Sequence, residues 1–446
     1  MTDTIKRRTG PTAGRRTLLK GTAAAAATVA MPGVLRHARA QGERITFWQY
    51  KNPPGSAAML YYAAAADRFQ SATGVQVDIE FKSAEGIEQA VAAAANAGEG
   101  FDAMLWWGGP TARNQASLGN VVALGDRFSD EFWSHRQGAA TMRYQGQQYG
   151  VPFDVSPWFM LYNRSVLADA GVDPDIFPPP TEAPIEWGAF LDVVAKVKAS
   201  GAAPLAWANQ QGYFNEWYFY NFEGQSFDDP QSIIDINLGE GSWQNQAVHD
   251  ALGAYRELYQ AGAFVEGGEV VPYEQHVRQL ASGQAAMCVY FDMSGATSAT
   301  IDVYGVENVG FTKVPAYRRD TALFDYICQE PNALYVASFS SKQDAAVAWL
   351  EHLTSVDEMN AFAAATQQGP ADDRWDLDNI SNPAIRAVFE GASAKGHPYP
   401  YNFVTQAQYT SLLEDGILYL RGDMSAEEIT AKWDEVDAEY KEQQGG

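Results

Sequence analysis

The mature part of the chain opens with two alternating patterns of apolar residues, one typical of strands and one typical of helices. Residues 44–50, 75–81 and 101–107 are short apolar or alternating runs, which predict strands. Residues 56–73 and 87–96 place apolar side chains at helical spacing, and a glycine follows each run. The resulting order of strand, helix, strand, helix, strand predicts a parallel sheet covered by helices.

One segment, residues 149–163 (YGVPFDVSPWFMLYN), changes character along its length. Pro152 fixes its own φ and favours an extended conformation in the residue before it. A half-polar stretch, residues 153–157, is followed by a continuous apolar run, residues 158–162. This pattern predicts a strand that crosses between two domains at the mouth of a cleft. An ordinary buried strand with a polar start is the alternative.

Two later segments have a similar design. Residues 285–292 form an apolar strand that ends at Asp292, and a third crossing is expected near residues 339–341. Such a set of crossings makes Asp154 and Asp292 neighbours at the bottom of one cleft. A chain of 446 residues also exceeds what one core usually holds, so we expect two domains.

The rest of the chain is mainly helical in its spacing, with short strands between the helices. The predicted fold class is therefore α/β. The expected helices are residues 165–171, 187–200, 244–261, 274–282, 342–353, 409–421 and 426–440, and the expected strands are residues 204–207, 309–314 and 333–339.

Residues 1–40 have the features of an export signal and are set apart from the fold. Arg15-Arg16 is followed by two leucines and a lysine, then by a mildly apolar run and by the cleavage pattern Ala38-Arg39-Ala40. This order resembles a twin-arginine signal peptide, with an ordinary secretory signal as the alternative. We therefore expect a periplasmic protein. No cysteine lies near the cleavage pattern, so we expect no lipid anchor.

The charge of the chain narrows the partners it can have. The whole chain has 31 basic and 55 acidic residues, and residues 1–40 contain eight of the former and one of the latter. The remainder has 23 basic and 54 acidic residues, a net charge of −31. Nucleic acid and anionic membranes are poor partners for such a surface. The two cysteines, Cys288 and Cys328, either form a disulfide or remain as buried thiols.

Aromatic and amide side chains follow the predicted strands. Ligands of parallel sheets bind at the carboxyl ends of the strands. Core packing is the alternative for any single tryptophan. The candidate ligand-binding residues at these ends and in the amide-rich segment after residue 207 are Trp48, Tyr50, Asn52, Trp106, Trp107, Asn209, Gln211 and Tyr213.

Motifs for nucleotide, serine-hydrolase and zinc-protease chemistry are absent from the sequence. We expect no cofactor and no metal. Residues 372–379 are rich in aspartate, but they lack the glycine and terminal glutamate of a calcium loop, and helix capping is the favoured reading. Asp154, Glu216 and Asp292 could form the carboxylate pair of a glycosidase. We favour hydrogen bonding to ligand hydroxyls instead, and therefore no enzymatic activity.

With these features assembled, the chain resembles the extracellular solute-binding proteins of ABC importers, in the sugar-binding class that includes maltose-binding protein. The resemblance is carried by FDAMLWW, by YGVPF with LYNRSVLADAGVD, by LASGQAAMCVYF and by VASFSSKQDAAVAWLEHL. It implies a monomer with two α/β lobes around a ligand cleft, which delivers a carbohydrate to a membrane permease. The implied lobes are residues 41–153 with 290–340, and residues 154–289 with 341–446.

The resemblance also implies which residues contact the sugar. It departs at Lys51-Asn52-Pro53-Pro54, which lacks the acidic residue of the family, and after Phe291, which lacks a Gly-Pro-Trp turn. The sugar is therefore expected to differ from a malto-oligosaccharide. The implied positions are Trp48, Asn52, Trp106, Trp107, Asp154 or Ser156, Tyr213, Phe291, Asp292 and Tyr409.

Three alternatives to a sugar carrier stay open. A tryptophan-lined acidic cleft also suits a cation such as a polyamine or a betaine. A secreted glycoside-active enzyme and a sensor or adhesion module are the others. Whether Lys51 or Arg113 recognises an acidic group on the ligand is likewise open.

Overall fold

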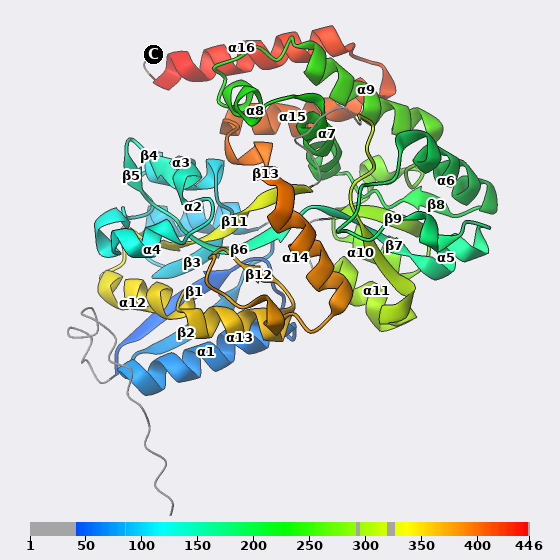
Figure 1. Cartoon of the computed structure of the whole chain (residues 1–446). Helices are drawn as coiled ribbons and strands as arrows, with labels where there is room; N and C mark the ends of the chain where they lie inside the picture. The colour runs from blue at the N-terminus through cyan, green and yellow to red at the C-terminus, as the bar shows by residue number, and fades with distance from the viewer. Residues whose placement is uncertain (1–41, 85, 291–294, 319–325, 445–446) are drawn as a thin grey trace, which may run out of the picture.

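The computed structural model describes residues 42–84, 86–290, 295–318 and 326–444. They form two lobes, each with its own sheet and its own covering helices (Figure 1). The chain passes between the lobes more than once. The expected two-lobe α/β fold is therefore confirmed.

The first lobe is built on a seven-stranded sheet. β1 (Arg44–Gln49) pairs in parallel with β2 (Gln76–Phe81) on one side and β3 (Ala103–Trp106) on the other. The helices between them are α1 (Ala57–Thr73) and α2 (Ile87–Ala97), as the apolar spacing predicts. The order of the main path is β12-β6-β11-β3-β1-β2, completed by β6 (Val151–Pro157), β11 (Tyr326–Val336), β12 (Gly369–Pro370) and β13 (Gly396–Pro398), which pairs with β11.

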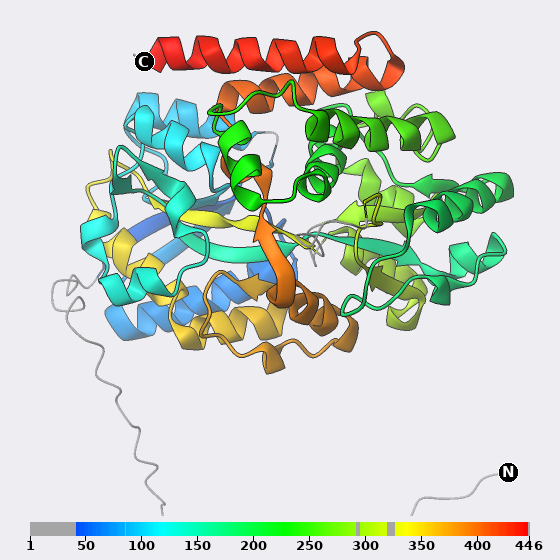
Figure 2. The same ribbon diagram turned by 45° about the horizontal axis from the view of Figure 1, so that its top comes forward.

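The second lobe is built on a four-stranded sheet of order β10-β7-β9-β8. Its most buried helix is α7 (Tyr213–Ser226), which packs against α9 (Gln246–Ala261). Figure 2 shows α16 (Ala426–Gln444) lying over α15 (Gln406–Arg421) at the outer face of this lobe. The strands are β7 (Phe159–Asn163), β8 (Ala203–Leu205), β9 (Ala285–Tyr290) and β10 (Val309–Thr312).

The crossing predicted at residues 149–163 is present. β6 pairs with β11 in the first sheet, and β7 pairs with β9 and β10 in the second. Trp158 joins the two strands and is fully buried. The half-polar stretch of this segment is therefore a strand of the first sheet, and the apolar run is a strand of the second.

The other two predicted crossings are wrong. β9 is followed by α11 (Ala296–Tyr304) and β10, which both pack in the second lobe. Residues 339–341 stay in the first lobe, where Ser340 donates a hydrogen bond to Asp102. The chain instead crosses between β10 and β11, and again between β13 and α15.

The implied lobe boundaries need the same correction. β10 belongs to the second sheet, although residues 290–340 were assigned to the first lobe. The helices α12 (Gln343–Leu353) and α13 (Val356–Thr366) pack in the core of the first lobe, although residues 341–446 were assigned to the second. Apolar spacing shows that a helix has a buried face, but not which sheet that face covers.

Three smaller observations concern the described residues. Cys288 is a buried free thiol, so the disulfide alternative does not hold. Asp372 is paired with Arg136 and Arg374, and Asp376 caps a short helix, while the described residues contain no cluster of metal-ligating side chains. The helices of the described residues are all too short or too polar to cross a membrane.

Candidate functional site

A cavity of about 690 Å³ lies between the two lobes. The first lobe contributes the loop after β1, the end of β3 and the segment between α13 and β12. The second lobe contributes the start of α7, the residues before and within α10 (Gln275–Ala281), the helix α11 and the segment from Tyr401 to Tyr409. The position agrees with the rule that ligands of such sheets bind beyond the carboxyl ends of the strands.

The first-lobe side of the cavity rests on a buried polar network, here called the polar floor (Tyr50, Lys51, Asp154 and Asn332). The ammonium of Lys51 lies 3.0 Å from Asp154 Oδ2. The Asn332 amide donates to Asp154 Oδ1 at 2.7 Å, and the Tyr50 hydroxyl donates to Asn332 Oδ1. Asp154 is only 2% exposed and does not line the cavity. It therefore positions Lys51 and, through Asn332, Tyr50, and both of these do line it.

The second-lobe side presents five aromatic residues, here called the aromatic wall (Tyr213, Trp217, Tyr273, Tyr401 and Tyr409). The Tyr273 ring is 5.4 Å from the Tyr213 ring and 5.6 Å from the Trp217 ring, and both pairs are edge-to-face. Tyr401 and Tyr409 form a further edge-to-face pair at 4.8 Å. Such contacts fix the rings against one another, so their free faces are held ready for a ligand.

Glu216 is a carboxylate within this wall. It is 5% exposed, and it accepts hydrogen bonds from the Tyr399 hydroxyl at 3.0 Å and from the Tyr409 hydroxyl at 2.8 Å. Burial raises the pKa of Glu216 to about 7, although the two tyrosine hydroxyls act in the opposite direction. The carboxylate is thus satisfied by neutral donors, and no basic side chain contributes to this shift.

Arg113 holds the segment that carries Tyr401. Its guanidinium donates to the carbonyls of Asn402 at 2.8 Å, Phe403 at 3.2 Å and Val404 at 3.0 Å. Gly109 lies so close to Asn402 that an added Cβ would come within 2.9 Å of its Cα. Arg113 does not line the cavity, whereas Lys51 does, so of the two only Lys51 is placed to contact a ligand.

Five of the predicted site residues line the cavity together. They come from the loop after β1, the end of β3, the start of α7 and the first turn of α15. These residues are Tyr50, Asn52, Trp107, Tyr213 and Tyr409.

Two predicted tryptophans instead lie in the core of the first lobe. Trp48 is 6% exposed and packs against Phe101, and the Lys82 ammonium lies 4.0 Å from its ring centre. Trp106 is 2% exposed and lies beneath Trp107, with 5.9 Å between the rings. Both tryptophans lie within their strands, whereas Tyr50 and Trp107 lie just beyond the ends of β1 and β3 and reach the cavity.

The crossing does not supply a lining residue in the way expected. Asp154 is in the polar floor, and Ser156 is 6% exposed and does not line the cavity. Phe291 and Asp292 lie outside the described residues.

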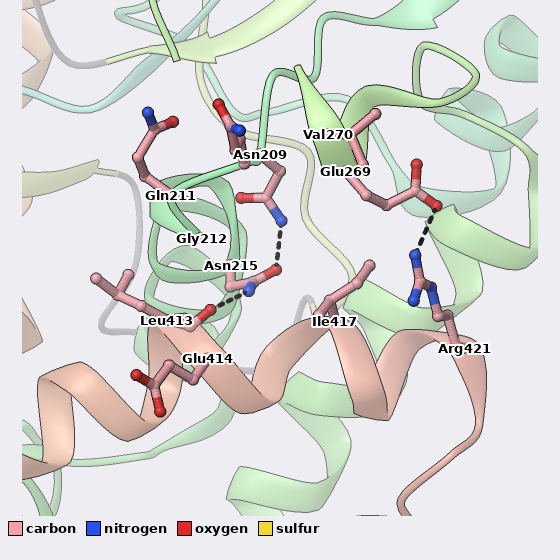
Figure 3. Close-up of a pocket in the computed structure, with 11 residues that line it drawn as sticks. Asn209, Gln211, Gly212, Asn215, Glu269, Val270, Leu413, Glu414, Ile417 and Arg421 are labelled. Carbon is pink, nitrogen blue, oxygen red and sulfur yellow. Dashed lines mark hydrogen bonds and ion pairs between the residues drawn. The ribbon is translucent and has the colours of Figure 1, made fainter. Parts of the chain in front are cut away.

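Asn209 and Gln211 line a second, smaller cavity of about 310 Å³ between the start of α7 and α15 (Figure 3). Asn209 donates to Asn215 Oδ1 at 2.9 Å, and Asn215 donates to the Leu413 carbonyl at 3.0 Å. Asn209 Oδ1 also accepts from the amide of Phe214. These amides therefore fix the start of α7 and lie outside the larger cavity. Arg421 and Glu269 close the far side at 3.7 Å.

Several lining residues were missed by the sequence analysis. Trp217 is one of them: it follows Tyr213 by four residues, and Glu216, which the sequence analysis did consider as a cleft carboxylate, follows Tyr213 by three, so the same helix face carries all three. That signal was available. No pattern in the sequence indicates Gln368, because this residue reaches the cavity only through the pairing of β12 with β6. Its side-chain oxygen is buried and has no hydrogen-bond partner among the described residues.

Comparison with known proteins supports a binding fold. A family model described as bacterial extracellular solute-binding protein matches residues 64–387. A chitin oligosaccharide binding protein of known structure is 19% identical, with a TM-score of 0.74 over 89% of this chain and 98% of its own. A protein linked to xylan utilization in Caldanaerobius polysaccharolyticus is also 19% identical, with a TM-score of 0.74 over 88% and 99%.

A third similar structure is an ABC transporter solute-binding protein from Thermotoga lettingae, bound with α-D-tagatose. It is 17% identical, with a TM-score of 0.73 over 89% of this chain and 99% of its own. No curated protein sequence matches significantly. At these identities the structural likeness establishes the two-lobe fold.

Proposed function

The chain belongs to the bacterial extracellular solute-binding proteins, and from this we propose that its cavity captures a carbohydrate for delivery to the membrane permease of an ABC transporter. Members of this family bind small molecules outside the cytoplasm. The observation that carries the sugar assignment is the lining of the 690 Å³ cavity, which combines aromatic rings with amides and carboxylates.

That combination matches the chemistry of a pyranose. The C–H faces of the ring are apolar and pack on aromatic faces such as those of Trp107 and Tyr213. The hydroxyl rim needs donors and acceptors, which Lys51, Asn52 and Gln368 provide. Each hydrogen bond contributes about 0.5–1.5 kcal/mol net. The named ligands of the similar structures, chitin oligosaccharide and tagatose, support the same class.

The experiment is a thermal-shift screen of the protein without residues 1–40 against mono- and oligosaccharides. A ligand at a hundredfold excess over its Kd adds about 2.7 kcal/mol to the stability of the folded state, and the melting temperature rises accordingly. If no sugar raises the melting temperature while a polyamine or a betaine does, the carbohydrate assignment is wrong.

The cationic solute is the second candidate, and one observation favours it. The cavity is lined by Glu216, Glu274 and Asp302, while its one lysine, Lys51, is already paired with Asp154. Aromatic rings also attract cations. An enzymatic role has less support, because Asp154 is held in the polar floor and does not form a pair with Glu216 across the cavity.

Three finer points belong to the same proposal. Residues 1–40 direct export by the twin-arginine route. The mature chain works as a monomer in the periplasm. Its net charge of −31 keeps it from nucleic acid. Light scattering of the purified mature chain tests the monomer, and replacement of Arg15 and Arg16 by lysine tests the export route through loss of periplasmic accumulation.

A further inference from the structure

The cavity has an excess of hydrogen-bond acceptors and negative charge that a neutral sugar does not require. Three carboxylates line it, and Glu216 is the one that is buried. The side-chain oxygen of Gln368 adds a buried acceptor that has no hydrogen-bond partner in the described part of the chain. A carboxylate only accepts, so the ligand must supply donors.

Among the described residues, the positive side chains near the cavity are already engaged. The Lys51 ammonium lies 3.0 Å from Asp154 Oδ2, with both side chains almost fully buried. Arg113 donates to backbone carbonyls and does not line the cavity. An acidic sugar would therefore meet three carboxylates and one lysine that a fourth carboxylate neutralises.

The surroundings of Glu216 indicate which group on a ligand would pair with its carboxylate. The carboxylate is held by two tyrosine hydroxyls, and burial raises the pKa of Glu216 to about 7 because no cation compensates it. His276 also lines this part of the cavity, and its Nδ1 lies 2.6 Å from the Tyr273 carbonyl, to which it can only donate. An ammonium group on the ligand would supply both the missing positive charge and several donors.

We propose that the cavity selects a sugar that carries a free amino group, with Glu216 recognising the ammonium and the aromatic wall packing on the ring. The proposal rests on the carbohydrate assignment above and names the chemistry within it. The aromatic faces also favour an ammonium-bearing ring over a neutral one, because ring quadrupoles attract cations.

The test uses pairs of sugars that differ at one substituent, a free amine in one and its neutral N-acetyl form in the other. Isothermal titration calorimetry compares glucosamine, galactosamine and mannosamine with their N-acetyl forms, and chitosan oligosaccharides with chitin oligosaccharides. Acetylation removes the charge and keeps the ring. In at least one pair we expect the amine to bind tenfold or more tightly than the N-acetyl form, and we expect glucuronate to bind more weakly than glucose.

The variant Glu216→Gln tests whether Glu216 causes the preference for amino sugars. This variant should weaken amine binding by tenfold or more, and by a larger factor than it weakens neutral-sugar binding. Glu414→Gln is the matched control, since it removes one negative charge from an exposed position outside the cavity. It should leave both affinities unchanged. The wild-type panel decides the proposal even if Glu216→Gln folds poorly.

The possible outcomes separate the two proposals. If N-acetyl or neutral sugars bind as tightly as the amines in every pair, the amine preference is overturned and the carbohydrate assignment stands. If putrescine or glycine betaine binds and no sugar does, the carbohydrate assignment itself is overturned. If nothing in the panel binds, both are overturned.

Discussion

The polar floor and the aromatic wall line the same cavity, and each contains a buried carboxylate. In the floor, Asp154 is paired with a lysine and with an asparagine amide. In the wall, Glu216 is held by two tyrosine hydroxyls and no cation. A carboxylate with its own counter-ion is a structural element, whereas one satisfied only by neutral donors remains able to respond to a charged ligand. The difference suggests that the floor is built to be rigid and the wall to discriminate.

The largest expected effect concerns the floor. Asp154→Ala removes the carboxylate 3.0 Å from the buried Lys51 ammonium, so we expect a loss of about 3–5 kcal/mol in the free energy of unfolding. Urea denaturation measures it. Adding Lys51→Met should recover part of the loss, and Ser156→Ala is a control at a neighbouring buried position. A loss below about 1 kcal/mol would show that the pair is not structural, and the contrast with the wall would disappear.

The next largest expected effect is on sugar affinity, and it comes from one aromatic residue on each side of the cavity. Trp107→Ala and Tyr213→Ala should each weaken sugar binding by on the order of 2 kcal/mol, about thirtyfold. Both side chains are only partly buried, so the ligand-free protein should lose little stability. Calorimetric titration and urea denaturation separate the two quantities. Trp106→Phe is the control, because it should change stability and leave binding intact. A large loss of ligand-free stability in Tyr213→Ala would make that residue part of the core.

A smaller effect follows from the carboxylates of α7. Burial raises the pKa of Glu216 to about 7 and that of Glu223 to about 8. Between pH 4.5 and these values the folded state holds protons that the unfolded state has released. The free energy of unfolding therefore falls as the pH rises through this window, by up to about 1.4 kcal/mol for each unit by which the pKa is raised. Melting temperatures from pH 5 to pH 9 measure the trend.

The variants Glu216→Gln and Glu223→Gln should each make that pH trend shallower. Asp154→Asn serves as the comparison from the floor, where the carboxylate has a lysine partner. An unchanged pH trend in both glutamate variants would mean that other groups cause it.

The smallest expected effect lies outside both surfaces. Arg421→Ala removes the cation that closes the second cavity, 3.7 Å from Glu269. We expect sugar affinity to change by less than twofold, because Arg421 does not line the larger cavity. A tenfold loss in calorimetric titration would show that the second cavity is part of the binding site.

The sequence patterns predicted where helices and strands lie better than they predicted which of them pair or pack together. The period-two and period-3.6 spacing located β1 to β3 with the helices between them, and the change of pattern within residues 149–163 located one crossing. The crossing predicted at residues 285–292 is wrong, because an apolar strand that ends in a polar residue has the same pattern whether it crosses to the other lobe or remains in one lobe. The assignment of α12 and α13 to the second lobe is wrong, because the apolar face of a helix does not indicate which sheet it packs against.

The site was predictable to the same extent. Tyr50, Trp107 and Tyr213 lie where a strand or a loop delivers a side chain, and the sequence marks such places. The predictions for Trp48 and Trp106 are wrong because both lie inside their strands, one or two residues before Tyr50 and Trp107, which reach the cavity just beyond the strand ends. Asp154 was placed correctly at the crossing, yet its partner Asn332 is 178 residues away, so its structural role could not be inferred. Gln368 depends on a similar long-range pairing.

The interleaved strand order bears on how the chain is made. The four-stranded sheet is complete once residue 312 has been synthesised, whereas the seven-stranded sheet still lacks β11, β12 and β13, the last of which ends at residue 398. The sheet that begins first is therefore finished last. During synthesis the edge of β3 that pairs with β11 remains unpaired until β11 has been synthesised. No single cut in the chain separates one complete sheet from the other.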